Sequence, residues 1–265
     1  MAAPITSMKD AYSLKGKIAI VTGASRGIGF GIATAMAQSG ADVAIFCRGI
    51  EKGYEAAAKI REYGVRCEAF QCDVSDLQSV KAAVAACYEK FDPVDILVNN
   101  AGVATTTAFM DMDENLDEWY RVLNTDLNGM VHMSFEVGKR MKEAGRGGCS
   151  IINVTSNAGM IVNDGISIIA YSVAKAGANH FTHCLASELS DYDITVNGIA
   201  PGFTHSTFSE AMPQEMEDAL NAGTLTHRFG EPIEVGALAV YLASPASRQV
   251  TGMVVVIDGG YMIRV

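Results

Sequence analysis

The chain has 265 residues, of which 49% are hydrophobic and 19% charged, so it can bury a substantial core and is not a disordered polypeptide. Its formal net charge of −10 disfavours general binding to nucleic acid, which requires a basic surface. No apolar run reaches the roughly 18–20 residues of a membrane span, and residues 1–15 hold no apolar stretch that resembles a secretory signal.

Apolar runs typical of β-strands alternate with helical segments along the whole chain. We expect strands at residues 18–21, 43–46, 67–71, 96–98, 150–154, 195–199 and 253–257. We expect helices at residues 27–39, 51–63, 77–90, 116–141, 170–189 and 235–242, the fourth either as one long helix or as two nearly continuous ones. No repeat, low-complexity tract or linker interrupts this order. The sequence therefore predicts an N-terminal arm at residues 1–12 and one dinucleotide-binding catalytic domain at residues 13–265.

Two of the expected strands, at residues 18–21 and 43–46, are apolar throughout. Such strands belong in a sheet that is covered on both faces. Their alternation with helices indicates parallel strands joined by right-handed crossovers. The predicted fold class is therefore α/β, with a single Rossmann-type doubly wound parallel sheet and helices on both faces. This fold by itself says nothing about chemistry.

A glycine-rich turn joins the first expected strand to the first expected helix. Glycines permit a tight turn, and the N-terminus of the helix offers free N–H groups and a positive dipole end to a pyrophosphate. The spacing is G-x-x-x-G-x-G, which differs from the more common dinucleotide fingerprint G-x-G-x-x-G. The candidate cofactor-binding residues in this turn are Gly23, Ser25, Arg26, Gly27, Ile28 and Gly29.

The end of the second strand indicates which dinucleotide binds. NAD sites usually place an acid there to hold the ribose hydroxyls, but this strand ends Phe46-Cys47-Arg48. Arg48 can instead pair with a 2′-phosphate, and Arg26 is a second candidate, because guanidinium groups make charge-assisted, fork-like contacts with phosphate. The sequence therefore favours NADP(H) as the cofactor.

A tyrosine and a lysine lie four residues apart on the expected helix at residues 170–189. Positions i and i+4 project from one face of a helix, which places Lys175 beside Tyr171. A phenol has an unperturbed pKa of about 10, and a fixed ammonium nearby favours phenolate, which suits acid–base catalysis at neutral pH. Ser156 follows the strand at 150–154, at the edge where ligands bind in open α/β sheets, and its hydroxyl can hold a substrate carbonyl oxygen.

The combination of these motifs resembles the short-chain dehydrogenase/reductase family, over about residues 16–260. The motifs that carry the resemblance are the glycine-rich turn, Asp73-Val74, Asn99-Asn100-Ala101-Gly102, Ser156 with Tyr171 and Lys175, Asn197 to Pro201-Gly202, and Asp258-Gly259-Gly260. The resemblance implies an oxidoreductase that transfers a hydride between NADP(H) and a carbonyl or secondary alcohol, with Tyr171 as the acid/base and no metal in catalysis. It also implies a homotetramer or a homodimer.

The same resemblance implies further cofactor contacts at the adenine, at the cofactor ribose and at the nicotinamide. In that order the residues are Asp73 and Val74; Asn99, Ala101 and Gly102; and Pro201, Gly202 and Thr204. Lys175, beside Tyr171, is also expected to bind the hydroxyls of the nicotinamide ribose.

Two departures from the family pattern bear on function. Many members carry an asparagine, in a pattern like N-L-x-G, whose backbone helps to hold a water for a proton relay to the lysine, whereas this sequence reads Asp126-Leu127-Asn128-Gly129. Asp126 can substitute if the relay uses the main-chain carbonyl, but not if it needs the amide side chain. The loop from Ser156 to Tyr171 is also longer than usual. Both features are similar to members that reduce ketoses or oxidise sugar alcohols, so we expect a ketose or polyol substrate.

Two alternatives stay open. The same catalytic residues serve 3-oxoacyl thioesters and steroid-like ketones, so the core of the active site does not separate these substrates. A non-catalytic NADP-binding regulator would use the same fold, although the intact set of Ser156, Tyr171 and Lys175 argues against it. Residues 203–222 break the strand–helix rhythm and are the best candidate for a lid over the substrate.

The six cysteines and five histidines show no metal-binding pattern. None of the cysteines forms a C-x-x-C pair, and Cys67 and Cys72 have no matching second half for zinc. His180 and His183 lie three positions apart, but no acid completes a metal site. We therefore expect no metal, and free thiols in a reducing cytoplasm.

Overall fold

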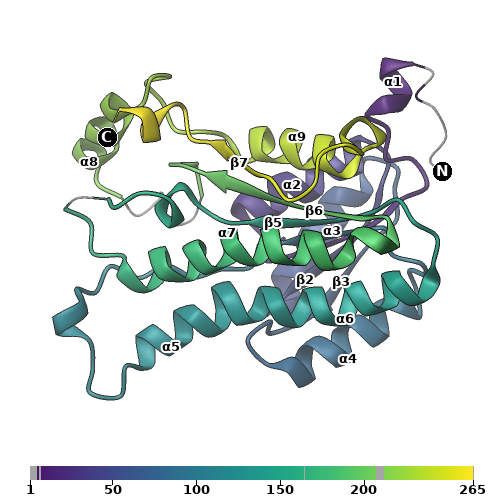
Figure 1. Ribbon diagram of the computed structural model, residues 1–265, viewed down its shortest axis with the longest axis horizontal. Coiled ribbons are helices and arrows are strands. Elements are labelled where there is room, and N and C mark those ends of the chain that lie inside the picture. The colour runs from purple at the N-terminus through teal and green to yellow at the C-terminus, as the bar shows by residue number, and fades with distance from the viewer. Residues whose placement is uncertain (1–4, 6, 164, 207–211, 265) are drawn as a thin grey trace.

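The structure is a computed structural model that describes residues 5, 7–163, 165–206 and 212–264. Within these residues, seven parallel strands form one sheet in the order β3-β2-β1-β4-β5-β6-β7 (Figure 1). Their bounds are β1 (Ile18–Thr22), β2 (Asp42–Cys47), β3 (Cys67–Gln71), β4 (Ile96–Asn99), β5 (Cys149–Val154), β6 (Ile194–Pro201) and β7 (Val254–Ile257). Each predicted strand forms within about two residues of its expected bounds.

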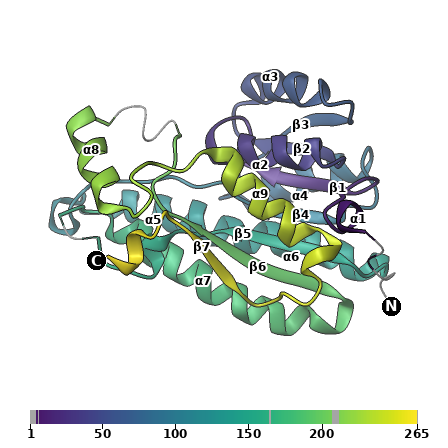
Figure 2. The same ribbon diagram turned by 90° about the horizontal axis from the view of Figure 1, so that it is seen from above.

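Helices cover both faces of the sheet, as Figures 1 and 2 show. One face carries α2 (Gly27–Gln38), α3 (Ile50–Arg61) and α9 (Pro232–Ala243). The other face carries α4 (Leu77–Tyr88), α6 (Gly129–Ala144) and α7 (Ile169–Leu189). This arrangement confirms the predicted α/β fold with a Rossmann-type doubly wound sheet.

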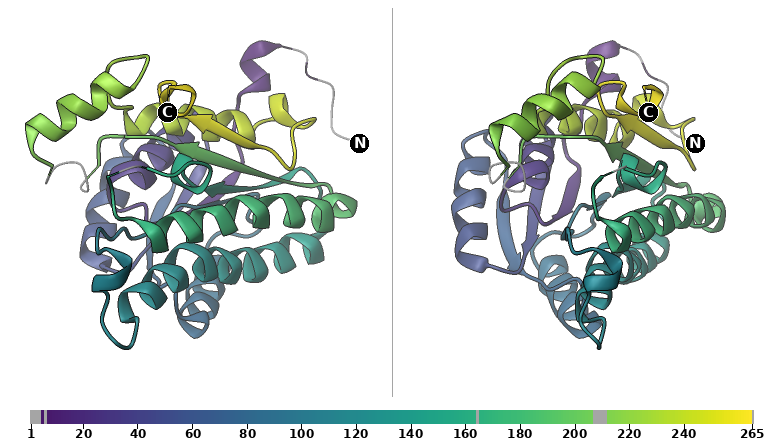
Figure 3. Two further views of the ribbon diagram at one scale, coloured as in Figure 1. Left: turned by 60° about the vertical axis from the view of Figure 1, so that its left-hand side comes forward. Right: turned by 90° about the vertical axis from the view of Figure 1, so that its left-hand side faces the viewer.

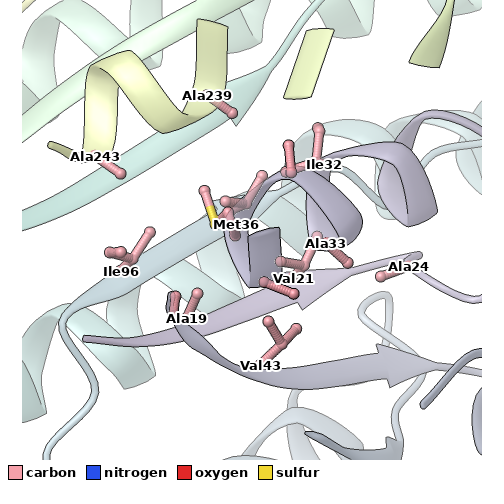
Figure 4. Packing of buried hydrophobic residues seen from close by; sticks show 14 of the residues in the cluster. Ala19, Val21, Ala24, Ile32, Ala33, Met36, Val43, Ile96, Ala239 and Ala243 are labelled. Carbon is pink, nitrogen blue, oxygen red and sulfur yellow. The ribbon is translucent and has the colours of Figure 1, made fainter. Parts of the chain in front are cut away.

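Side chains of the central strands alternate between two hydrophobic clusters, one on each face of the sheet. In β1, Ala19 and Val21 belong to the cluster that α2 and α9 cover, whereas Ile18 and Ile20 belong to the cluster that α4, α6 and α7 cover. Figure 4 shows the first cluster, with Met36 of α2 among its side chains. Because both faces of β1 and of residues 43–46 in β2 are buried, these strands form continuous apolar runs in the sequence.

The expected helix at residues 116–141 consists of three consecutive segments. α5 (Asp117–Leu123) continues into one turn of π-helix (Asn124–Asn128), and α6 follows directly from Gly129. Single π-turns inside α-helices occur frequently at functional sites. Here the π-turn holds Asp126 in the interior, where only 1% of the residue is exposed.

Two segments contain more structure than the sequence indicates. Residues 203–222, the expected lid, contain most of the helix α8 (Gln214–Gly223), whereas residues 207–211 lie outside the described residues. The expected N-terminal arm carries α1 (Met8–Ala11), and the ring of Tyr12 lies 6.2 Å from that of Tyr241 in α9. None of the described helices is long and apolar enough to cross a membrane.

Candidate functional site

The carboxyl ends of the strands meet at one edge of the sheet, on the left in Figure 1. The strand order reverses between β1 and β4, because the chain adds β2 and β3 on one side of β1 and β5 to β7 on the far side of β4. Ligands of open α/β sheets bind at such a switch point. A small recess, too narrow to admit a water molecule, lies there between Thr22, Val74, Asn99 and Ala101, and three of these four residues are predicted cofactor contacts.

Hydrogen bonds tie together the two loops that leave β1 and β4. The hydroxyl oxygen of Thr22 accepts the backbone N–H groups of Asn100, at 2.9 Å, and Ala101, at 3.0 Å. The side-chain amide of Asn100 donates to the carbonyl oxygen of Thr22 at 2.9 Å. A Cβ atom on Gly23 or Gly29 would collide with these groups. The glycines of the turn are therefore needed for the close packing of the two loops as well as for ligand approach.

The glycine-rich turn leaves the start of α2 free for a ligand. Arg26 is the N-cap residue and its side chain makes no capping hydrogen bond, and no acid lies in the first turn. The first backbone N–H groups of a helix have no partner within the helix, and they carry the positive end of its dipole. Gly27, with φ of +56°, faces open space apart from Ser206. These features fit a pyrophosphate group.

The two predicted phosphate-binding arginines are exposed at the same edge. Arg48 directly follows β2, and Arg26 lies in the turn after β1, the neighbouring strand. Among the described residues neither guanidinium forms an ion pair with an acid. Both are therefore available to an anionic ligand.

The predicted adenine contacts lie after β3. The carboxylate of Asp73 accepts the backbone N–H of Ser75 at 3.0 Å and its hydroxyl at 2.6 Å, which fixes the turn before α4. Val74 is 6% exposed and lines the recess described above. Ile28, also a predicted contact, packs partly against the hydrophobic core.

Among the predicted catalytic residues, Ser156 lies at the carboxyl end of β5, and Tyr171 and Lys175 lie near the start of α7. Ser156 follows β5, is 7% exposed, and accepts the backbone N–H of Ala158 at 3.1 Å. Tyr171 lies in the first turn of α7, and the Nζ atom of Lys175 is 5.4 Å from the centroid of its ring. In the part of the chain that the structure describes, no hydrogen bond joins Ser156 to Tyr171.

Asp126 lies deeper in the site and contacts the predicted catalytic lysine. Its Oδ2 atom is 3.2 Å from the Nζ atom of Lys175, and its Oδ1 atom accepts the backbone N–H of Val103 at 2.8 Å. Lys175 also donates to the carbonyl oxygen of Val154, at the end of β5, at 3.2 Å. The sequence placed Asp126 in the site but did not indicate that its carboxylate pairs with the lysine.

Burial and charge act on this ion pair in opposite directions. Burial raises the pKa of Asp126, although the ammonium of Lys175 and the amide of Val103 act to lower it. Burial alone would lower the pKa of Lys175, but the carboxylate of Asp126 and the phenol of Tyr171 outweigh burial and raise it. The carboxylate form of Asp126 therefore favours the ammonium form of Lys175.

The predicted nicotinamide contacts follow β6, which ends at Pro201. The backbone N–H of Gly202 donates to the carbonyl oxygen of Ile257 at 3.0 Å, and a Cβ atom on Gly202 would lie 2.5 Å from that of Asp258. Thr204 is 7% exposed and donates to the carbonyl oxygen of Gly202 at 3.2 Å. The turns after β6 and β7 are thereby packed together.

The C-terminal turn after β7 contributes contacts that the sequence did not indicate. The carboxylate of Asp258 accepts the backbone N–H of Met262 at 2.9 Å and the side-chain amide of Asn157, next to Ser156, at 3.4 Å. Arg264 donates to the carbonyl oxygen of Ala222, near the end of α8, at 2.9 Å. The C-terminal turn therefore connects the serine loop with α8.

Comparison with known proteins places this architecture in one family. Residues 23–262 match the family model described as Enoyl-(Acyl carrier protein) reductase. The chain is 36% identical to sorbose reductase of Candida albicans, over 97% of this chain and 90% of that protein. It is 35% identical to NADP-dependent mannitol dehydrogenase of Alternaria alternata, over 98% and 97%, and 37% identical to 3-oxoacyl-[acyl-carrier-protein] reductase FabG of Vibrio harveyi, over 95% and 100%.

Solved structures agree with this result. A short-chain type dehydrogenase/reductase from Mycobacterium marinum superposes with a TM-score of 0.92 at 33% identity, covering 96% of this chain and 99% of that one. Gluconate 5-dehydrogenase from Burkholderia cenocepacia, in complex with NADP and tartrate, gives a TM-score of 0.91 at 29% identity, over 98% and 100%. The chain therefore belongs to the short-chain dehydrogenase/reductase family of oxidoreductases.

Proposed function

We propose that this protein interconverts a ketose and the corresponding sugar alcohol with NADP(H) as the redox partner. The observation that carries the proposal is the contact of Lys175 with buried Asp126, one helical turn from Tyr171. A fixed positive charge thus lies beside a proton donor, at the same edge of the sheet as the uncapped start of α2. The names of the sorbose reductase and mannitol dehydrogenase relatives support a sugar substrate.

The residues of the sheet edge fit the successive parts of NADP(H). We assign the pyrophosphate to the glycine-rich turn and the start of α2, and the 2′-phosphate to Arg48 and Arg26. We assign the adenine to Asp73 and Val74, which follow β3. The turn after β6, from Pro201 to Thr204, suits the nicotinamide.

The proposed reaction needs one hydride and one proton, and NADPH supplies the hydride when it is bound. Tyr171 donates its phenolic proton to the substrate oxygen as negative charge develops there. Ser156 donates a hydrogen bond to the same oxygen. The ammonium of Lys175 stabilises the phenolate that remains, and in the opposite direction the phenolate accepts the proton of the alcohol.

Asp126 acts in this proposal as a positioning residue. Its carboxylate replaces the amide that many family members carry at this position, and it holds Lys175 through a direct ion pair. A lysine in this buried position would otherwise lose its proton more easily, because burial disfavours the charged form. The carboxylate therefore maintains the charge on which Tyr171 depends.

We infer a cytoplasmic location from the state of the thiols. All six cysteines are free, and all except Cys184 are buried. Burial raises the pKa of Cys67, Cys72 and Cys87 to about 12, which keeps these thiols protonated and unreactive. Such thiols are typical of proteins in a reducing compartment.

We also propose that the protein is a homotetramer, because it exposes two separate apolar faces. Val131 and Phe135 on α6, and Ile169 and Val173 on α7, are 36–62% exposed, and these helices lie side by side on one face of the sheet (Figures 1 and 3). The edge strand β7 has no buried residue. Two self-complementary faces generate a tetramer by two sets of two-fold axes, whereas one face gives only a dimer.

Enzyme assays can test the proposed preference for ketoses and the role of Tyr171 as the proton donor. NADPH oxidation, followed by absorbance, should be faster with ketoses than with bulky ketones or with acyl thioesters, the substrate class in the name of the FabG relative. Tyr171→Phe should lower kcat by about 10²–10⁴-fold, because it removes the proton donor. NADPH binding, measured by fluorescence, should be largely unchanged. Near-normal turnover in this variant would overturn the role of Tyr171.

The second prediction concerns the cofactor. Arg48→Ala should raise the KM for NADPH by about 10–100-fold, since a hydrogen bond to a charged group contributes about 1.5–3 kcal/mol. The KM for NADH should not change, because NADH lacks the 2′-phosphate. Lys59→Ala, which removes an exposed cation of α3, is the matched control. Equal use of NADH and NADPH by the wild type would contradict the assignment of both arginines.

The third prediction concerns pH. In Asp126→Asn, burial of Lys175 is no longer offset by a carboxylate, so the pKa of the lysine falls. The ammonium is then lost at lower pH, and alcohol oxidation with NADP⁺ should decline at lower pH than in the wild type. Glu143→Gln, which neutralises an exposed carboxylate of α6 that is 4.0 Å from Lys139, should leave the profile unchanged. If alcohol oxidation by Asp126→Asn declines at the same alkaline pH as in the wild type, the positioning role of Asp126 is refuted.

The fourth prediction concerns assembly. Light scattering after gel filtration should give four times the 28.1 kDa of the chain. Phe135→Glu should disrupt the face of α6 and α7, and Val256→Glu the face at β7, and each single variant should give a dimer. A monomeric wild type would exclude the proposal, and a wild-type dimer that only one substitution dissociates would leave a single interface.

A further inference from the structure

Three segments that follow the carboxyl ends of strands are the ones we assign to the substrate side of the site. Residues 103–120 follow β4, residues 157–163 and 165–168 lie between Ser156 and α7, and residues 203–206 and 212–227 follow β6 and include α8. Val103 and Met112 of the first segment pack in one cluster with Tyr171. In Figure 1 the segment before α5 and the helix α8 lie on either side of the N-terminal end of α7.

These three segments contain no lysine or arginine, although the chain holds 20 such residues. They contain many acids instead. Acids of the described residues in the first and third segments are Asp111, Asp113, Glu114, Asp117, Glu118, Glu215, Glu217 and Asp218. None of these forms an ion pair within the described part of the chain. The third segment also holds His205, which lies 3.7 Å from Glu231, and His227.

Three of the cations near these segments are already held by protein groups. Lys175 is paired with Asp126, and Arg228 is paired with Glu234. Arg264 donates to carbonyl oxygens at the end of α8. The start of α8, which would otherwise attract an anion through its dipole, carries Glu215 and Glu217 in its first turn. Two exposed arginines next to these segments form no ion pair among the described residues: Arg121, on α5 just beyond the first segment, and Arg26, next to Gly27, which faces Ser206 of the third segment. The 2′-phosphate of NADP(H) is assigned to Arg26, which leaves Arg121.

This distribution of charge has a direct consequence for binding. Proteins recognise carboxylates and phosphates chiefly through arginine and lysine, whose charge-assisted hydrogen bonds compensate for the lost hydration. A substrate carboxylate that enters between these segments would lose water, find no lysine or arginine on them, and enter the negative potential of their acids. A sugar hydroxyl carries no charge and avoids both costs.

We propose that the substrate is uncharged, so that the enzyme accepts neutral ketoses and polyols and rejects sugar acids, sugar phosphates and thioesters of phosphate-bearing carriers. This inference rests on the proposed function and adds a charge requirement to it. Similarity to known proteins does not decide the matter, because relatives and structural neighbours include both a sorbose reductase and a gluconate 5-dehydrogenase.

A matched pair of ketones isolates the effect of charge. L-Sorbose and 5-keto-D-gluconate share one carbon skeleton and one configuration, but the second has a carboxylate in place of a terminal CH2OH group. With NADPH, wild-type kcat/KM for L-sorbose should exceed that for 5-keto-D-gluconate by about 30-fold or more, equivalent to about 2 kcal/mol. The same contrast should separate D-fructose from D-fructose 6-phosphate.

Charge reversal on α8 tests whether the acidic segments cause this selectivity. Glu215→Lys combined with Glu217→Lys should raise kcat/KM for 5-keto-D-gluconate by about 5–10-fold at low salt, and about 0.5 M salt should abolish the gain by screening. The value for L-sorbose should hardly change. Glu188→Lys combined with Asp191→Lys makes the same change in net charge at the opposite end of α7, and should affect neither substrate.

The outcomes separate this inference from the proposed function. Comparable wild-type efficiency with both ketones would overturn the charge requirement and leave the ketose assignment intact, and Arg121→Gln would then show whether Arg121 binds the carboxylate. Turnover of acetoacetyl-CoA but of no ketose would overturn both. Turnover of neutral bulky ketones alone would support the charge requirement and overturn the ketose assignment.

Discussion

The buried ion pair between Asp126 and Lys175 holds the site together. Lys175 also donates to the end of β5, and Asp126 accepts an N–H from the segment after β4, so the pair joins two strands to α7 and to the π-turn before α6. Either charge alone would be costly to bury, and removing one partner leaves the other uncompensated. The position of Tyr171, one turn from Lys175, therefore depends on a contact between two distant parts of the chain.

The rest of the edge is organised around the reversal of strand order between β1 and β4. Hydrogen bonds between Thr22 and Asn100 connect the loop after β1 to the loop after β4. The glycines of the turn allow these two loops to pack closely. The same glycines leave the start of α2 open to a phosphate. One local arrangement thus serves both the stability of the sheet edge and the binding of a cofactor.

The segments assigned to the substrate are held differently. Residues near the C-terminus contact segments from earlier in the chain. Asp258 holds Asn157, the neighbour of Ser156, and Arg264 holds the end of α8. The serine loop and α8 are therefore fixed by the same C-terminal turn. In the proposed site, the segments assigned to the substrate are therefore separate from Tyr171 and Lys175, so the substrate could change while the proton-transfer groups stay the same.

The sequence alone determined the strands, most of the helices and the Tyr171–Lys175 spacing, because each depends on local periodicity or on the conformational needs of glycine. The position of Ser156 after a strand placed it at the carboxyl edge of the sheet, and the family pattern placed Asp126 in the site. The tertiary structure decided what the sequence left open: the pairing of Asp126 with Lys175, the π-turn that turns Asp126 inward, the helix α8 and the bond between Asn157 and Asp258. These depend on which distant side chains packing brings together in a buried, low-dielectric setting, and no local pattern encodes that choice.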